Sequence, residues 1–511
     1  AVALDRAALA FSWIPGSDRI AVTEARATSD ALSTAATGQI LFEEGVTGPV
    51  QMQLRLGPTI LNPEGVFERR VAFDEGLIEA RLTQSPLGLH LGQVMVTGPS
   101  GTARLAGRLA FLANGIRGTL TLAVPRMAVD ELTALWPPDL QQHARRWFAN
   151  NLIGGIARDV AGALRLTPGM PPRAQASFAF DGGRFRFMRR MPPAEDASGA
   201  AQLDGERFVI RVDDAEVPAI GPGEEATPET TRIAVNDVTF VIPDARARPA
   251  MGELSMRAEG EIGDILTLVN NRPLRLLDRL RRDRDLASGR GDARVEVRLP
   301  LRPGNAPADI DWSVEAVLQD VATDTLIPGR RLEGGRLRMV ATPAAVEIEG
   351  ALTFDGVSFE GGWRQALPPR STEPILPDAP PRPPVPLPEP GRVTGIARVA
   401  PDDLSRLGID LGAVDLRGRT DVAIDVTLPQ GEPPRLVATS NLRGMAASLP
   451  AISWSKPAER DADFRVEATL GTPPDVTRVS LDAPGLDASG RVNLRSGGGL
   501  ERAVFDTVRT G

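Results

Sequence analysis

The sequence predicts a mainly β protein: a long, twisted and curled antiparallel sheet that forms a hydrophobic groove, with a few short helices as plugs. Two observations predict it. Short runs in which apolar and polar residues alternate recur along almost the whole chain, at a spacing that gives roughly 25 to 30 strands. Only three short helical segments are present, too few to cover one apolar face per strand. The uncovered faces could therefore pack in a sandwich or a solenoid, or line the inner face of a curled sheet that holds an apolar ligand.

Composition excludes several classes of protein. The 511 residues carry a net charge of -8, and the basic residues are scattered among acidic ones, which excludes a nucleic-acid partner. The chain has no Cys, which excludes disulfides, thiol catalysis and Cys-ligated zinc. Lys456 is the only lysine among the 58 basic residues, and GC-rich coding explains this preference for arginine over lysine. No segment approaches the ~18 to 20 apolar residues of a membrane-spanning helix.

Residues 11–124 read as successive half-buried strands. Met52, Leu54 and Leu56 alternate with polar neighbours, as strand residues do. Residues 104–124 predict two strands around the turn Asn114-Gly115, because both residue types tolerate positive φ.

The clearest helix is predicted after Pro137-Pro138, which block a helix before Asp139. Asp139 is placed to cap the first turn, and Gly154-Gly155 supply a left-handed exit. The apolar side of this helix is predicted to pack on strands. It carries Leu140, Ala144, Trp147, Phe148 and Leu152. A strand ending at Leu166 follows.

Further strands are predicted beyond Leu166. Residues 177–188 suggest two strands around Asp181-Gly182-Gly183, and residues 206–212 form a strand with one apolar side. Residues 221–231 predict an exposed loop. Two more helical patches, at 262–286 and 401–412, each precede a strongly alternating strand.

Alignment of three such strands on their last apolar residue suggests a weak internal repeat of roughly 130 residues. The aligned positions are Leu166, Leu299 and Leu428, with Asp159, Asp292 and Asp421. The expected organisation is an N-terminal β-meander at 1–127 and helix-plus-β units at 128–261, 262–399 and 400–511. The third segment contains a proline-rich loop at 368–390, and the last unit is truncated.

Catalytic and metal motifs are absent. His90 and His143 are the only histidines, and neither has a partner at metal-binding spacing. No nucleophile elbow, Walker loop or dinucleotide fingerprint occurs. We therefore expect no enzyme activity, cofactor or metal. A glycan-acting enzyme stays a minor alternative, because any two of the 66 acidic residues could meet in space.

The apolar strand faces are the candidate binding surface. They are mostly aliphatic, and only 4% of the residues are aromatic, which favours acyl chains over sugars. The groove candidates are Phe208, Ile210, Val212, Val295, Val297, Leu299, Leu352, Phe354, Val422, Ile424, Val426 and Leu428.

Two motifs resemble the AsmA-like family, specifically its YhdP-type branch. The first contains Trp136, Pro137, Leu140, Ala144, Arg145, Trp147, Asn151, Leu152 and Gly155. The second contains Leu442, Gly444, Leu449, Pro450, Lys456 and Pro457.

The resemblance implies a bridge-like lipid-transfer protein of the Gram-negative periplasm, with phospholipids and the inner and outer membranes as partners. It implies attachment to the inner membrane by a segment outside this chain, and we expect the chain to be an excerpt. The alternative function is an envelope scaffold, or an assembly factor for outer-membrane proteins, that uses edge strands to bind other envelope proteins by β-augmentation.

Overall fold

A computed structural model describes most of the 511 residues. The described residues are 5–13, 15–45, 47–62, 69–99, 101–136, 138, 142–187, 190–271, 277, 284–302, 304–325, 330–373, 389–407, 409, 412, 414–471, 474–494 and 500–510. The predicted proline-rich loop falls mainly outside them.

The fold class is confirmed as mainly β, with 65% of residues in strands and 8% in helices. Twenty-eight strands belong to a large antiparallel sheet, which is not closed into a barrel over the described residues, and three strands form a small second sheet. Contacts group the chain into two compact units. The first unit contains 1–218, 234–256 and 298–302, and the second contains 219–233, 257–297 and 303–511.

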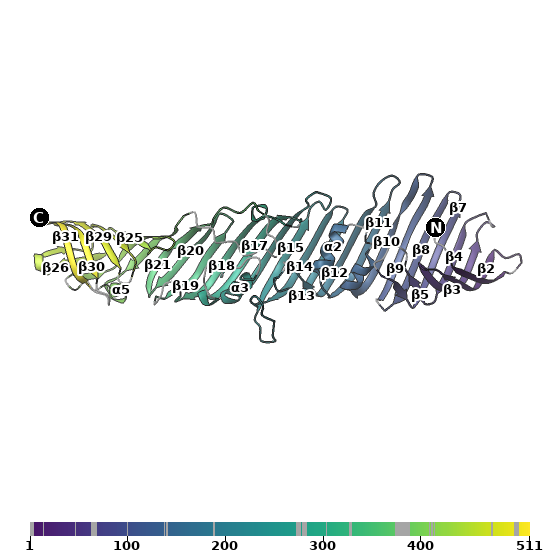
Figure 1. Ribbon diagram of the computed structural model, residues 1–511, viewed down its shortest axis with the longest axis horizontal. Helices are drawn as coiled ribbons and strands as arrows, with labels where there is room; N and C mark the ends of the chain where they lie inside the picture. The colour runs from purple at the N-terminus through teal and green to yellow at the C-terminus, as the bar shows by residue number, and fades with distance from the viewer. Residues whose placement is uncertain are drawn as a thin grey trace. The chain divides into compact units, whose positions relative to one another are not determined.

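In the first unit most strands pair with the next strand along the chain, always antiparallel (Figure 1). At β3 the order branches, because this strand pairs with both β4 and β5 while β4 pairs with β7. The strands are β1 (Arg6–Trp13), β2 (Arg19–Thr28), β3 (Leu32–Phe42), β4 (Val50–Leu56), β5 (Thr59–Leu61), β6 (Val71–Phe73), β7 (Glu75–Gln84), β8 (Leu87–Gly98), β9 (Gly101–Leu112), β10 (Gly115–Ala128), β11 (Ile156–Leu166), β12 (Arg173–Phe185), β13 (Ala194–Asp204) and β14 (Arg207–Pro218).

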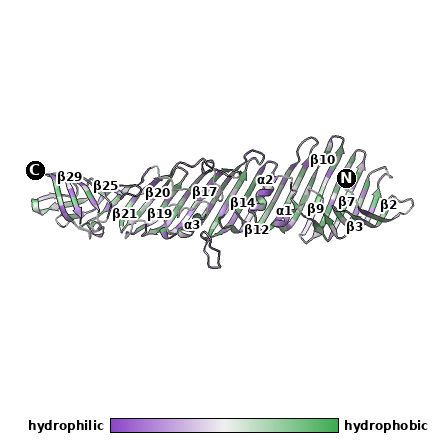
Figure 2. Cartoon of the chain, viewed as in Figure 1, coloured by the Kyte–Doolittle hydropathy of each residue, from purple (hydrophilic) through white to green (hydrophobic). Residues whose placement is uncertain are grey.

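Hydrophobic and hydrophilic residues alternate along many strands (Figure 2). Strand register places the apolar residues of neighbouring strands on one face of the sheet. Directly opposed residues point to the same side, so a row that crosses the sheet shows the character of that side. One row runs through ten strands, from β3 to β14. It consists of Gly38, Leu54, Ile78, Val94, Leu105, Leu122, Gly162, Ala176, Leu203 and Phe208. We call this side the apolar face and the other the polar face.

Two helices follow β10 instead of the single predicted helix: α1 (Val129–Leu135) and α2 (Gln142–Asn151). The predicted helix corresponds to α2, and its expected first turn at 139–141 lies outside the described residues. Gly154 and Gly155 have φ of +84° and +101°, as expected for the exit. The prediction missed α1, which ends before the two prolines.

The predicted turn at Asp181-Gly182-Gly183 is wrong. The segment lies inside one continuous strand, β12, and the register with β13 shifts between Phe180 and Gly183. Gly182 has φ of +59°, so the glycine pair makes a β-bulge. Tight hairpin turns and G1-type bulges both use glycine at positive φ, which is why local sequence did not distinguish them.

Three strands cross from one unit to the other: β15 (Arg232–Ile242), β16 (Met251–Glu261) and β17 (Ser288–Pro300). The second unit then continues with strands that again pair antiparallel in chain order, apart from the small sheet of β23, β26 and β27. They are β18 (Asp311–Thr323), β19 (Leu332–Ala341), β20 (Ala345–Phe354), β21 (Val357–Ala366), β22 (Gly391–Val399), β23 (Asp415–Gly418), β24 (Thr420–Leu428), β25 (Arg435–Ser440), β26 (Met445–Leu449), β27 (Trp454–Lys456), β28 (Asp463–Thr469), β29 (Asp475–Ala483), β30 (Leu486–Leu494) and β31 (Leu500–Thr510).

The second unit contains two α-helices in its described residues, α3 (Ile262–Val269) and α5 (Pro401–Arg406), with 3-10 turns at Arg284–Leu286, Pro307–Asp309 and Pro450–Ile452. Residues 221–231 form the predicted exposed loop. Helices α1, α3 and α5 begin at Val129, Ile262 and Pro401. The predicted units and the repeat stay predictions.

Candidate functional site

The apolar face of the second unit is a broad aliphatic surface. One row of opposed residues crosses eleven strands from β18 to β31. It consists of Ala316, Met339, Ile348, Trp363, Val393, Val426, Leu436, Ala468, Val476, Val492 and Ala503. The larger side chains of this row are half-buried, so water reaches each of them.

Among the described residues, cover of this face is local. Leu404 and Leu407, on and just after α5, pack on a small buried cluster of Val357, Ala397 and Val399. Phe359 extends from that cluster, and its ring lies over two glycines: Cζ would come within 2.7 Å of a Cβ on Gly361 and 2.6 Å of one on Gly395. On β24, Ile424 packs on the same cluster and Val426 lies two residues farther along the strand, and both side chains are half-buried.

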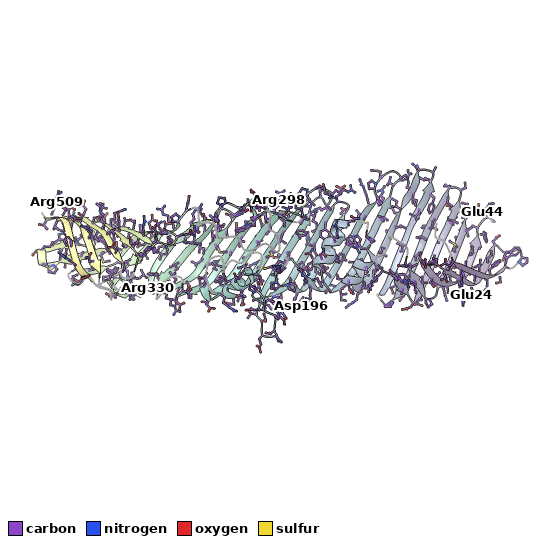
Figure 3. All side chains as sticks on the ribbon, in the orientation of Figure 1. Glu24, Glu44, Asp196, Arg298, Arg330 and Arg509 are labelled. Carbon is purple, nitrogen blue, oxygen red and sulfur yellow. The ribbon has the colours of Figure 1, made fainter. Side chains whose placement is uncertain are left out.

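A polar clamp fixes the end of α5 to the β20–β21 turn. Arg330, labelled in Figure 3, donates to Asp355 Oδ2 at 2.8 Å and to the Leu407 carbonyl at 3.2 Å. The Arg331 N–H donates to Asp355 Oδ1 at 2.9 Å. Burial acts to raise the pKa of Asp355, but these hydrogen bonds and the Arg330 charge outweigh it, so the pKa lies below its ordinary value.

The small sheet covers the apolar face near β29 and β30. Trp454 packs with Ala483 and Leu486, and its Nε1 donates to the Pro484 carbonyl at 3.0 Å. Lys456 is buried, and its Nζ donates to the carbonyls of Leu442, Met445 and Pro457 at 2.8, 2.9 and 3.1 Å. Burial lowers the pKa of Lys456, although Asp461 and Glu459 act to raise it.

The first unit contains a sealed region. Phe148 of α2 is fully buried and meets Phe178 edge-on, with ring centroids 5.3 Å apart. Phe180 and Phe185 continue this aromatic cluster at a centroid distance of 5.3 Å. The neighbouring groove candidates of β14 are also buried. Phe208, Ile210 and Val212 are 2%, 2% and 6% exposed.

The twelve groove candidates therefore separate into two groups. The three β14 residues belong to a closed core and are not accessible. The other nine are half-buried. They are Val295, Val297 and Leu299 on β17, Leu352 and Phe354 on β20, and Val422, Ile424, Val426 and Leu428 on β24. Sequence reasoning missed Phe359 and Trp363, which the alternation Val357, Phe359, Gly361, Trp363 would have indicated.

The first of the two sequence motifs surrounds the sealed region. Trp136 lies 6.2 Å from the Phe148 ring, and the Nε of Arg145 donates to the Trp136 carbonyl at 3.0 Å. The Asn151 carbonyl accepts from the Arg186 N–H at 2.7 Å, and Gly155 begins the exit toward β11. Pro137, Leu140 and the side chain of Trp147 lie outside the described residues. The second motif forms the small sheet around Lys456.

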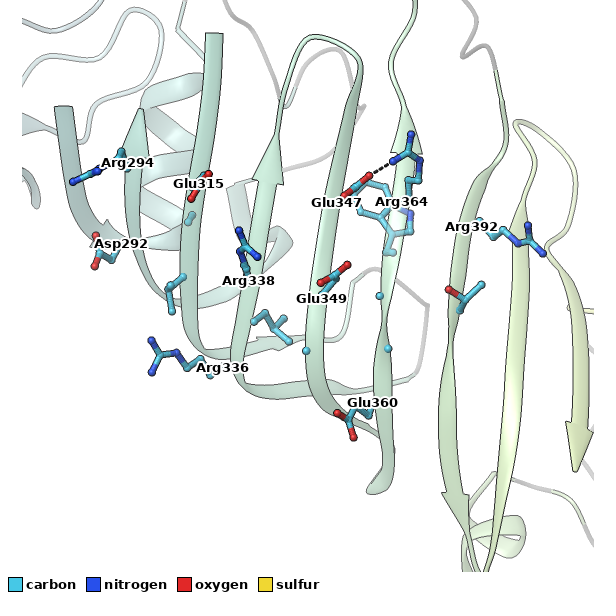
Figure 4. A pocket seen from close by; sticks show the side chains of 18 of the residues that line it. Asp292, Arg294, Glu315, Arg336, Arg338, Glu347, Glu349, Glu360, Arg364 and Arg392 are labelled. Atoms are coloured by element: carbon cyan, nitrogen blue, oxygen red, sulfur yellow. Dashed lines mark hydrogen bonds and ion pairs between the residues drawn. The ribbon is translucent and has the colours of Figure 1, made fainter. Parts of the chain in front are cut away.

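The polar face carries exposed ion pairs and a shallow hollow of about 1240 Å³ (Figure 4). Arg257 and Asp292, and Arg392 and Asp425, form two-point pairs. Hydrogen bonds from these arginines hold the pKa of Asp292 and of Asp425 below the ordinary range. None of the groove candidates lines this hollow. Glu347 and Arg364 pair within it.

Among the described residues, no His, Asp and Glu side chains form a group of three or more that could hold a metal ion. His90 is exposed on β8, and the side chain of His143 lies outside the described part of α2. The carboxylates in the hollow are interleaved with arginines and do not converge as a catalytic pair would.

No protein-family model, curated protein or solved structure matches this chain. Among the helices in the described part, none is long and apolar enough to cross a membrane.

Proposed function

We propose that this chain binds phospholipid acyl chains on the apolar face of its second unit and conducts phospholipids along that face. The observation that carries the proposal is the unbroken apolar row from Ala316 to Ala503. Its large members are half-buried, and among the described residues only α5 and the small sheet provide local cover. Burial of acyl chains would contribute about 25 cal/mol per Å² of apolar surface. Because this contribution is non-directional, a chain can slide from strand to strand.

The proposal extends to a cellular setting. The resemblance of Trp136, Arg145 and Asn151, and of the segment around Lys456, to the YhdP-type branch supports transfer between the inner and outer membranes in the periplasm. It also supports attachment to the inner membrane by a further segment. The proposed transfer is passive and involves no catalytic step.

Strand β22 offers a matched test. Val393 is a member of the apolar row, whereas Ile396 lies on the polar face and is 53% exposed. Native mass spectrometry and lipid extraction would be applied to the purified chain, to Val393→Asp and to Ile396→Asp. We expect phospholipid with the wild type and Ile396→Asp and at least a tenfold loss with Val393→Asp. Absence of lipid from the wild type, or equal lipid in both variants, would remove the proposal.

The second candidate is a scaffold that acts by β-augmentation. In the described residues β31 pairs only with β30, and Val504, Phe505 and Val508 on it are exposed. An added strand would cover these side chains and satisfy the free backbone groups. Protection of β31 from hydrogen exchange by an envelope protein, but not by lipid, would favour this candidate.

A further inference from the structure

The edge of the first unit formed by the β7–β8, β9–β10 and β11–β12 turns differs in composition from the rest of the chain. Residues 80–129 contain no Asp or Glu but five arginines, in a protein with a net charge of -8. The three turns, at 85–86, 113–114 and 167–172, contain no charged residue. Successive hairpins of an antiparallel sheet place these turns on one edge.

Large apolar side chains are exposed at these turns. Ile116 and Met170 are 43% and 59% exposed, and Phe111 lies directly opposite Ile116. Two of the turns are in contact, since a Cβ on Gly115 would lie 3.6 Å from Cβ of Pro168. The exposed set is Leu87, Phe111, Leu112, Ile116 and Met170. Single exposed apolar residues are ordinary, but several on adjoining turns form a patch.

A basic row crosses the polar face of the same hairpins. The directly opposed residues from β7 to β12 are Arg81, His90, Arg108, Thr119, Arg165 and Arg173. Arg81 pairs with Glu43. Arg108, Arg165 and Arg173 are exposed and have no acidic partner among the described residues. Arg165 and Arg173 face each other directly, and like charges in that arrangement cost stability.

Unpaired like charges beside an exposed apolar patch indicate a partner that is negative and apolar at once. Arg108 and Phe111 are three residues apart on β9, so their side chains point to opposite faces of the sheet, and at ~3.3 Å per residue the basic row lies about 10 Å from the apolar tips along the strand. In a bilayer the phosphate groups lie above the acyl boundary by a similar depth, and surface-bound segments insert about 5–10 Å.

We propose that this edge docks on an anionic phospholipid bilayer. Leu87, Phe111, Ile116 and Met170 enter the acyl boundary, while Arg108, Arg165 and Arg173 contact the headgroup phosphates. The binding is peripheral and independent of whether the apolar face of the second unit carries lipid.

Vesicle flotation with the full chain tests this docking. We expect flotation with vesicles of equal phosphatidylcholine and phosphatidylglycerol, weak flotation with phosphatidylcholine alone, and loss of binding at high salt.

Each guanidinium near an anionic surface contributes roughly fivefold in affinity. Arg165→Gln/Arg173→Gln is therefore expected to weaken binding roughly 25-fold, and folding should not suffer because a repulsion is removed. Phe111→Ser/Ile116→Ser, which removes two of the inserting side chains, should abolish flotation.

The matched control is Arg336→Gln/Arg338→Gln, which removes two exposed arginines from β19 in a surface of mixed charge. This variant should float like the wild type. Equal flotation on both vesicle types, or an equal loss in the control, would overturn the proposal. If Arg165→Gln/Arg173→Gln instead removes self-association in analytical ultracentrifugation and leaves flotation unchanged, the edge binds a second copy and the proposal fails.

Discussion

The region under α2 in the first unit and the region under α5 in the second use the same construction with opposite results. In both, a phenylalanine ring lies over a glycine of the sheet: Phe180 over Gly199, and Phe359 over Gly361 and Gly395. Phe180 is fully buried among other rings, whereas Phe359, which packs on the same cluster as Leu404 and Leu407, is half-buried. The ten residues of α2 and their aromatic cluster exclude water from the sheet below them. In the described residues, the six of α5 leave Phe359 partly accessible to water.

The largest expected effect comes from a charge placed in the closed region. Ile210→Asp should cost more than about 4 kcal/mol in the free energy of unfolding, because no water reaches the new carboxylate. Val426→Asp, on the half-buried face, should cost about 1 kcal/mol. Urea denaturation of both variants measures the difference. Equal costs would mean that the two regions do not differ in access to water.

Removal of a phenylalanine ring should also cost more free energy of unfolding in the closed region than in the open one, by a smaller margin. Phe148→Ala leaves a cavity in the aromatic cluster and is expected to cost about 3–5 kcal/mol. Phe359→Ala should cost about 1–2 kcal/mol, because part of the ring is already in water. Trp136, 6.2 Å from Phe148, provides a fluorescence signal for the first variant. A larger cost for Phe359→Ala would reverse the assignment of open and closed regions.

The sequence predicted the strands of both regions but not which of their faces are covered. Alternation with a period of two indicated the strands, because it depends only on neighbouring residues. The same alternation marked Ile210 and Ile424 as equal groove candidates, although the first is in a closed core. What covers a strand face depends on residues far along the chain, such as Phe148, and alternation does not record them.

Local signals also had limits in the helices and turns. The two prolines directed attention to α2, while α1 before them carries only Asp130 and Glu131 in its first turn as a start signal. The bulge at Gly182 and the branching of strand order at β3 depend on which strands pair, and no single segment determines that.

The clamp of α5 gives a weaker, local effect. Arg330→Gln should loosen α5 by roughly 1–2 kcal/mol, seen as faster hydrogen exchange at residues 401–407 while β24 is unchanged. The folded pKa of Asp355 lies below its ordinary 3.8, so the clamp contributes fully above that pH and is lost as the pH falls through the lowered value. Helix α2 should not change over the same range, and parallel loss of α2 protection would contradict this.

The smallest effects are expected on the polar face, which is alike in the two units. Arg158 pairs with Asp181 in the first unit at 2.7 Å, and Arg257 pairs with Asp292 in the second at 2.8 Å. All four side chains are about a third or more exposed, so Arg158→Gln and Arg257→Gln should each cost no more than about 1 kcal/mol. Thermal denaturation at low and high salt checks this. An unequal response would show that the units also differ on their polar side.

Burial of Lys456 has a practical consequence for anyone who handles this protein. Its ammonium is the only side-chain amine in the chain, and three carbonyls enclose it. Reagents that acylate surface amines, including common fluorescent esters and amine cross-linkers, will find no side chain to modify while the protein is folded. Acylation of Lys456 would then report that the small sheet has opened, which makes one residue a built-in indicator of unfolding.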